Sequence, residues 1–212
     1  MKKLILPLLL ILGITMLVAV ESAPSDVVGY VKYQCTPGLN FVALPLNSQY
    51  ATTTDLGLAY PQITSIQVWN GTYWEGVNYD PDWGWDGELT LTNTSVLFIA
   101  VETNVDMYSL GEVPAPLPQF NFSVGLNTIY LPLNKASITD TDALGIELPS
   151  VSSVQNWTGT NWTGVNYDPD WGWDGTMSLS IGMPIFVAVD SPTAPWPTMS
   201  GRVSNPSNTR SK

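Results

Sequence analysis

A stretch of twelve residues occurs twice in this chain, and the second occurrence begins 88 positions after the first. Residues 76–87 and 164–175 both read GVNYDPDWGWDG. The similarity continues outwards, because GLNFVALPLN at 38–47 returns as GLNTIYLPLN at 125–134. A repeat of this length predicts two copies of one structural unit rather than one continuous fold.

The repeat sets the expected domain boundaries. Residues 28–113 form the first predicted β repeat domain (the first copy), and residues 118–203 form the second (the second copy). Residues 114–117 are rich in proline and predict a short, extended linker. Residues 1–23 are expected to be a signal peptide, and residues 204–212 a polar tail.

The N-terminal residues predict export. Lys2 and Lys3 precede an apolar run at residues 4–20, and the small residues Ser22 and Ala23 follow it, as a cleavage site requires. A retained membrane anchor is the alternative, although the run is slightly short for a full span. We therefore expect a secreted or cell-surface protein, in contact with a membrane only if this segment stays uncleaved.

Within each copy the local patterns favour β-strands. Residues 41–44 are apolar and stop before Pro45, as in a short strand. Residues 96–101 are continuously apolar, as in a strand buried on both faces. Apolar and polar residues alternate at 177–181, the period of a half-buried strand. The fold class that follows is all-β, with two tandem homologous small β-sandwich or barrel domains after a signal peptide.

Turn signals recur in both copies, whereas helical signals are weak. Asn-Gly at 70–71 and Asp-Gly at 86–87 and 174–175 favour tight hairpins. Helical spacing is weak throughout, and the best candidates are single turns at 53–58 and 140–145.

The first copy opens with VGYVKYQCTPGLNFVALPLN at 28–47 and continues with an I-x-V-W-N-G-x-x-W stretch at 66–74. With its apolar final strand, this pattern resembles β-rich tandem-repeat exported bacterial proteins of unknown function. The resemblance covers most of each copy and implies secretion and β architecture. It implies no active site.

Composition narrows the classes of function. The net charge is −11 and only 12% of the residues are charged, so the chain lacks the clustered basic face that nucleic acid needs. The chain has no histidine, which excludes a Ser-His-Asp or Cys-His catalytic group. A carboxylate pair for glycoside hydrolysis remains open among residues 80–88. The duplication of these acids in two small domains suits two binding sites better, so we expect no enzyme.

The repeated segment contains the strongest candidate site. Oxygen ligands on alternate residues of a glycine-containing loop suit a hard cation such as Ca²⁺, the only cofactor that the sequence suggests. The candidate ligands are Asn78, Asp80, Asp82 and Asp86 in the first copy and Asn166, Asp168, Asp170 and Asp174 in the second. The alternative is a tight turn in which Asx side chains bond to nearby backbone.

Tryptophans flank these acids. Trp83, Trp85, Trp171 and Trp173 are candidates for carbohydrate binding, because an aromatic ring stacks on a sugar face beside hydroxyl-bonding carboxylates. The alternative is a core position, since small β domains bury tryptophan. In an extended loop Trp83 and Trp85 would share one face and the aspartates the other. A second set is predicted to be core: Trp69, Trp74, Trp157 and Trp162.

The glycosylation sequons and the single cysteine are two further features of the sequence. N-glycosylation sequons begin at Asn70, Asn93, Asn121, Asn156 and Asn161, and chance in a chain rich in Asn, Ser and Thr is the other explanation. Cys35 is the only cysteine and aligns with Phe122, which predicts a buried apolar position.

These observations predict a structural or adhesive module of the cell surface, non-catalytic and able to self-assemble, for example into a filament. Its expected partners are other copies of itself or other surface proteins. The alternative is a carbohydrate-binding protein with two equivalent sites and glycans as ligands. Solvent exposure of the four tryptophans at 83–85 and 171–173 discriminates between them.

Overall fold

The computed structural model describes residues 28–198. The predicted signal peptide at 1–23, the end of the second copy at 199–203 and the predicted polar tail at 204–212 lie outside the described residues. Among residues 28–198, neither helix has the length and apolar composition that crossing a bilayer requires.

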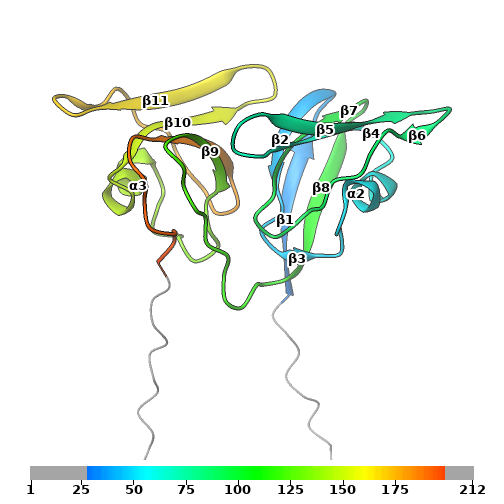
Figure 1. The fold of residues 1–212 in the computed structure, drawn as a ribbon, viewed down its shortest axis with the longest axis horizontal. Helices are drawn as coiled ribbons and strands as arrows, with labels where there is room; N and C mark the ends of the chain where they lie inside the picture. The colour runs from blue at the N-terminus through cyan, green and yellow to red at the C-terminus, as the bar shows by residue number, and fades with distance from the viewer. Residues whose placement is uncertain (1–27, 199–212) are drawn as a thin grey trace, which may run out of the picture.

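The fold is all-β, as predicted, and consists of three antiparallel sheets (Figure 1). None of the three closes into a barrel within residues 28–198. The first copy contains a three-stranded sheet in the order β1 (Val28–Cys35), β8 (Val105–Glu112), β3 (Asn47–Ser48). Its second sheet runs β2 (Gly38–Ala43), β7 (Val96–Val101), β4 (Ile63–Trp69), β5 (Trp74–Asp80), β6 (Gly84–Trp85).

The second copy contributes one five-stranded sheet. Its strands run in the order β12 (Gly172–Trp173), β11 (Trp162–Asp168), β10 (Val151–Trp157), β13 (Pro184–Val189), β9 (Gly125–Tyr130). The pairing registers of the two five-stranded sheets correspond: Ser65 pairs with Asn78 as Ser153 pairs with Asn166. Both sheets also have the same irregularity, between Ile63 and Ser65 and between Val151 and Ser153. Each sheet therefore takes its strands from one copy alone.

Two short helices lie where the sequence placed single helical turns. They are α2 (Thr53–Ala59) and α3 (Thr141–Glu147). Thr52 and Asp55 form a capping box at the start of α2, and the Asp140 side chain accepts the Ala143 amide at the start of α3. Such caps satisfy amides that the first helical turn leaves unpaired. This explains how helices of seven residues form in a chain with weak helical spacing.

Two local predictions were wrong. The alternating segment at 177–181 and its counterpart at 89–91 form no strand, and each region has a single isolated bridge, Asp140 to Ser178 and Thr52 to Thr90. The alternation reflects burial instead, since Leu91 and Leu179 are buried. The linker is also not fully extended, because the chain bends at Ala115 and Pro116.

The apolar cores are arranged asymmetrically. One cluster lies wholly within the first copy, around Leu56, Ile66 and Leu97. The other fills the second copy and takes in Phe41 and Phe98 from the first. The reason is that β2 and β7 are buried on both faces: Val42, Leu97 and Ile99 point into the first core, and the residues between them face the second copy.

Aromatic rings form the junction between the copies. Phe98 and Phe186 occupy equivalent positions of β7 and β13, and each contacts tryptophans of the other copy. Trp74 lies 5.7 Å from Phe186 and Trp162 lies 5.9 Å from Phe98, measured between ring centroids. These reciprocal contacts are the pattern of a two-fold interface. The four tryptophans predicted to be core lie at this junction, where Trp162 remains 48% exposed and the others are half-buried.

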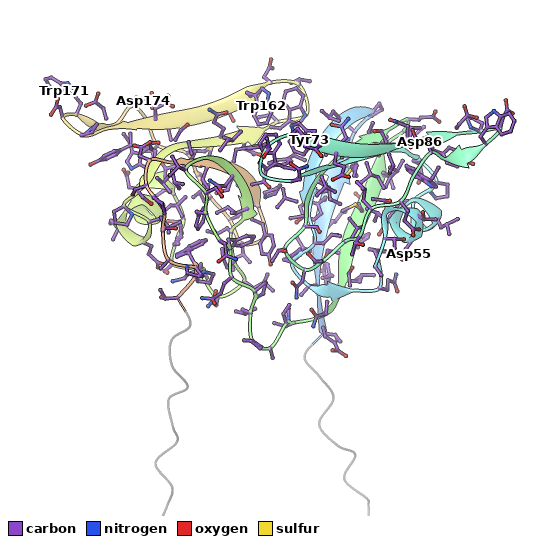
Figure 2. The ribbon with its side chains drawn as sticks, in the orientation of Figure 1. Asp55, Tyr73, Asp86, Trp162, Trp171 and Asp174 are labelled. Carbon is purple, nitrogen blue, oxygen red and sulfur yellow. The ribbon has the colours of Figure 1, made fainter. Side chains whose placement is uncertain are left out.

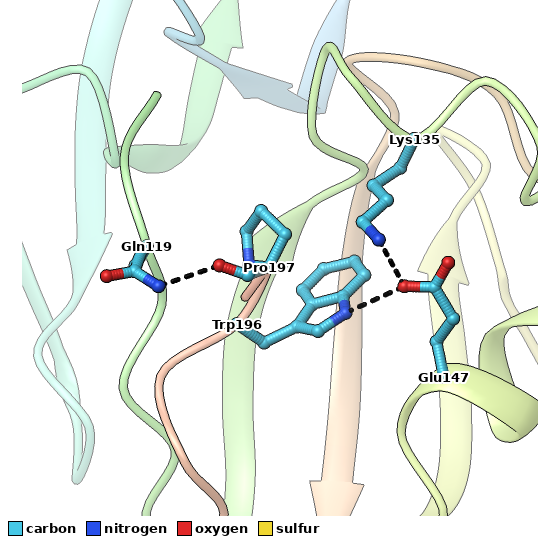
Figure 3. A network of polar contacts seen from close by, with 5 residues as sticks. All are labelled: Gln119, Lys135, Glu147, Trp196 and Pro197. Carbon is cyan, nitrogen blue, oxygen red and sulfur yellow. Dashed lines mark hydrogen bonds and ion pairs between the residues drawn. The ribbon is translucent and has the colours of Figure 1, made fainter. Parts of the chain in front are cut away.

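A network specific to the second copy fixes the end of the described chain (Figure 3). The Glu147 carboxylate pairs with the Lys135 ammonium group and accepts a hydrogen bond of 3.3 Å from the Trp196 indole. Gln119 donates to the carbonyl oxygen of Pro197 at 2.7 Å. Phe120 and Trp196 then form a single bridge where the first copy has the full β1–β8 ladder.

Candidate functional site

The repeated twelve residues build one hairpin in each copy, and both hairpins have a tryptophan at the tip. Residues 81–83 turn the chain between β5 and β6, and Gly84 follows with φ of 80°, a left-handed conformation that glycine adopts without a steric cost. Trp83 is therefore held away from the sheet and is 88% exposed. Trp171 is also 88% exposed, and Figure 2 shows it at the outer end of β11.

An aspartate at the end of each outer strand fixes the turn. The Asp80 carboxylate accepts hydrogen bonds from the backbone amides of Asp82 at 2.8 Å and Trp83 at 3.1 Å. Asp168 makes the same two bonds to Asp170 and Trp171, at 2.8 and 3.1 Å. These are Asx turns, which fix the backbone of a loop through a side chain. The exposed tryptophans are thus attached to a defined backbone.

A second aspartate closes the base of each hairpin. The Asp86 carboxylate accepts from the Asn78 backbone amide at 2.7 Å and from the Asn78 side-chain amide at 3.2 Å. Asp174 accepts from Asn166 in the same way, at 2.8 and 3.1 Å. Hydrogen bonds to the charged form lower the pKa of Asp86 and of Asp174 below the ordinary value. The Asp-Gly pairs at 86–87 and 174–175 therefore close the base of the hairpin and do not form its turn, contrary to the prediction.

The candidate calcium ligands are distributed among these bonds. The Asn78 and Asp86 side chains bond to each other, Asp80 caps the turn and Asp82 points to solvent as an exposed side chain. Within residues 28–198 no group of three or more acidic or cysteine side chains lies close enough to hold a metal ion. This geometry favours the turn alternative. Calcium binding stays a prediction, and melting that is indifferent to both millimolar Ca²⁺ and chelator would exclude it.

The second tryptophan of each hairpin packs inward against a helix. Trp85 meets Tyr79 edge-on at 5.6 Å and Trp173 meets Tyr167 at 5.4 Å, measured between ring centroids. Each indole also lies against a helix glycine. A Cβ atom on Gly57 would come within 2.3 Å of Trp85, and one on Gly145 within 3.1 Å of Trp173. Glycine is therefore required for the close approach at α2 and is less tightly required at α3.

The two tryptophans of each loop do not share a face, contrary to the expectation from an extended loop. The turn at 81–83 rotates Trp83 outward while Trp85 stays half-buried. Solvent exposure of the four tryptophans was to discriminate between a structural module and a carbohydrate-binding protein. It gives a mixed result, because each copy has one exposed ring and one half-buried ring. The exposed rings lie one in each hairpin, so they form no flat platform within a copy.

A groove of about 410 Å³ runs beside the hairpin of the second copy. Its walls are Tyr167 and Trp173 from the hairpin, Ile146 from α3, and Asp142 at the start of that helix. The first copy has Tyr79, Trp85 and Leu58 at the matching positions, with Thr54 in place of Asp142. Leu58 and Ile146 are both strongly exposed, which gives each hairpin an apolar neighbour.

Sequence reasoning missed part of this surface. Tyr79 and Tyr167 belong to the repeated segment, so their recurrence is a signal, yet the predicted sites comprise only its asparagines, aspartates and tryptophans. Leu58 and Ile146 gave no signal, because their exposure depends on which face of a seven-residue helix meets the sheet. The long strand β8 was also missed, although Val105, Met107 and Ser109 alternate with polar neighbours in its sequence.

The sequons and the cysteine lie in varied settings. Asn70, Asn121 and Asn161 are exposed, while Asn93 and Asn156 are half-buried. Glycosylation stays a prediction at all of them. Cys35 is buried, and burial raises the pKa of its thiol to about 11.

No protein-family model matches this chain, and neither a curated protein nor a solved structure matches it.

Proposed function

We propose that this protein is a non-catalytic adhesive module, exported to the cell surface, whose two hairpin tips are its contact points with partners. In this proposal the two copies are tandem domains of the predicted sandwich type. The partners are other copies of the chain or other surface proteins, and repeated contacts of this kind could build a filament.

The observation that carries the proposal is the pair of tryptophans that are 88% exposed on identical hairpins. A large apolar ring in water has no folding benefit, whereas tryptophan is enriched among the residues that dominate binding energy at interfaces. Because the Asx turns already order the loop, binding costs less conformational entropy. Figure 2 supports a bivalent arrangement, since the hairpin containing Trp171 and the hairpin containing Asp86 extend towards opposite ends of the molecule.

The net charge of −11 limits the partners. Like charges repel, so a strongly acidic partner surface is disfavoured at low ionic strength. Apolar or neutral partner surfaces fit best at the tips, and self-association should strengthen as added salt screens the repulsion.

Carbohydrate binding at the same hairpins is the second candidate, and the groove beside Tyr167 and Trp173 favours it. An aromatic wall with one carboxylate, Asp142, is a combination that can stack on a sugar and accept hydroxyl hydrogen bonds.

Retention of beads under flow tests the proposal. Beads coupled to the full chain would be passed over a surface coated with the same protein and over a surface coated with cellulose. We expect Trp83→Ala/Trp171→Ala to abolish retention on the protein-coated surface, while the matched control Tyr73→Ala, an exposed aromatic in another turn, leaves it intact. Unchanged retention of the double variant would refute the proposal. Retention on cellulose alone, lost in Trp173→Ala, would favour the carbohydrate alternative.

A further inference from the structure

A cavity at the junction of the two copies differs from its symmetry-related counterpart. It has a volume of about 410 Å³ and lies between Trp69 of β4, Thr128 of β9 and the loop around Thr92 and Ser95. On the other side of the junction, the equivalent space has a volume of about 370 Å³ and is lined by Trp157, Phe41 and the charged side chain of Lys32. The two tryptophans correspond in the repeat, and so do Thr128 and Phe41.

The exchange of Phe41 for Thr128 changes the chemistry of the space. Phe41 stacks on Phe186 at 5.1 Å and on Phe98 at 4.6 Å, and so occupies its side of the junction with an aromatic ring. Thr128 pairs with Phe186 across β9 and β13, at the position where Phe41 pairs with Phe98. A small hydroxyl side chain therefore stands where the first copy has a phenyl ring.

The two tryptophans also differ in hydrogen bonding. The Trp157 indole donates to the carbonyl oxygen of Leu39 at 2.8 Å. The Trp69 indole nitrogen is buried and has no acceptor among residues 28–198. A buried donor without a partner destabilises the protein that contains it. The surrounding protein covers this nitrogen, so a ligand oxygen would relieve that cost only after a small movement of the indole ring.

The remaining cavity walls are uncharged, and they combine the apolar Val68, Val96 and Phe120 with polar side chains. Gln119 donates its amide group to Pro197, which leaves its amide oxygen able to accept a hydrogen bond. Thr92, Ser95 and Asn121 add hydroxyl and amide groups. None of the cavity-lining residues in the described part of the chain is charged. The volume lies within the range of about 300–1,000 Å³ that small-molecule sites occupy.

From these features we infer that the junction cavity is a binding site for one neutral sugar unit. The Trp69 ring supplies an apolar wall for the C–H face of a pyranose, and the surrounding hydroxyls and amides match its hydroxyl groups. The uncharged walls and the net charge of −11 select against acidic sugars. This site is distinct from the two hairpin tips, and it does not depend on their adhesive role.

The full chain would be titrated with glucose, galactose, mannose and N-acetylglucosamine while the indole N–H signals of its nine tryptophans are recorded by NMR. The Trp69 signal would be assigned from Trp69→Phe. We expect at least one sugar to shift this signal with a Kd on the order of 1 mM, a value suited to the few heavy atoms of a pyranose. Glucuronate and cyclohexanol serve as charged and hydroxyl-poor controls, and both should bind at least tenfold more weakly.

Thr128→Phe copies the residue of the first copy, replaces a hydroxyl-bearing wall by a phenyl ring, and should weaken sugar binding at least tenfold. Trp69→Phe, which keeps a ring and removes the donor, should also weaken it and provides a second test if Thr128→Phe does not fold. Trp157→Phe and Trp83→Ala/Trp171→Ala are the matched controls and should bind as the unmodified chain does. No shift with any neutral sugar at about 50 mM, far above the expected Kd, would overturn the inference. Binding that survives both Thr128→Phe and Trp69→Phe would also overturn it.

Discussion

The two copies have the same structure at their hairpin tips. They differ at their shared junction and in the region of β1 and β8, which we call the lower end of each copy. The hairpins reproduce the same hydrogen bonds within 0.1 Å, as in the bonds of 2.7 and 2.8 Å from Asn78 and Asn166 to their aspartates. At the junction, Thr128 of the second copy takes the position that Phe41 has in the first. At the lower ends, the β1–β8 ladder of the first copy is reduced to a single bridge between Phe120 and Trp196.

This comparison separates two kinds of constraint. The junction and the lower ends could diverge, because each copy meets different neighbours there. Nothing in the packing of Trp83 and Trp171 requires them to be tryptophan, since both rings lie in solvent. Their identity in the two copies is what the proposed binding role requires.

The largest effect is expected at the residue pair that breaks the junction symmetry. Phe41→Ala removes a ring stacked on two others and should lower the free energy of unfolding by about 3–5 kcal/mol. Thr128→Ala, at the equivalent position, should cost less than about 1 kcal/mol. Urea denaturation of the two variants measures both values. Equal losses would mean that the junction is symmetric in energy despite its sequence.

A smaller difference is expected at the helix glycines. Gly57→Ala forces a Cβ atom to within 2.3 Å of Trp85 and should destabilise the protein by about 1–3 kcal/mol. At Gly145 the corresponding approach is 3.1 Å, so a small movement of Trp173 suffices. The higher helix propensity of alanine, about 1 kcal/mol, should then offset most of the cost. Thermal melting of the two variants would sharpen the comparison, and a Gly145→Ala variant as unstable as Gly57→Ala would contradict it.

The smallest effect concerns pH and should be the same in both copies. Hydrogen bonds from Asn78 and Asn166 lower the pKa of Asp86 and Asp174 in the folded protein. Their stabilising contribution is therefore fully present above the unfolded pKa, near 3.8, and is lost as the pH falls through the lower folded pKa. Asp86→Asn and Asp174→Asn should each reduce the loss of melting temperature between pH 4 and pH 2, by equal amounts. A pH dependence that changes in only one variant would show that the hairpins are not equivalent.

The repeat predicted much of this architecture. The apolar run at 96–101 correctly predicted strand β7, because a strand buried on both faces needs a continuous apolar sequence. The predicted helical turns became α2 and α3, whose capping residues were visible in the sequence. The position of the hairpin turn could not be predicted, since Asp-Pro at 80–81 and Asp-Gly at 86–87 are both turn signals. Only the pairing of Tyr79 with Trp85 decides between them.

The site was predictable in identity but not in orientation. The repeated residues identified the correct loop, yet the exposure of Trp83 and the partial burial of Trp85 depend on a turn that reverses the chain between them. The junction cavity was beyond sequence reasoning, because it depends on how the copies meet. The alignment of the two copies shows that Thr128 replaces Phe41, but it does not show that this residue lines a cavity.

The central claim is that two equivalent tryptophan tips bind, and dissociation from a sensor surface densely coated with the same protein tests it most directly. Two linked contacts can hold a protein about 10²–10⁴ times more tightly than one. Trp83→Ala and Trp171→Ala should therefore each accelerate dissociation by at least about a hundredfold and by the same factor, and the double variant should not bind measurably. Single variants that dissociate as slowly as the unmodified protein, or a double variant that still binds, would contradict the claim.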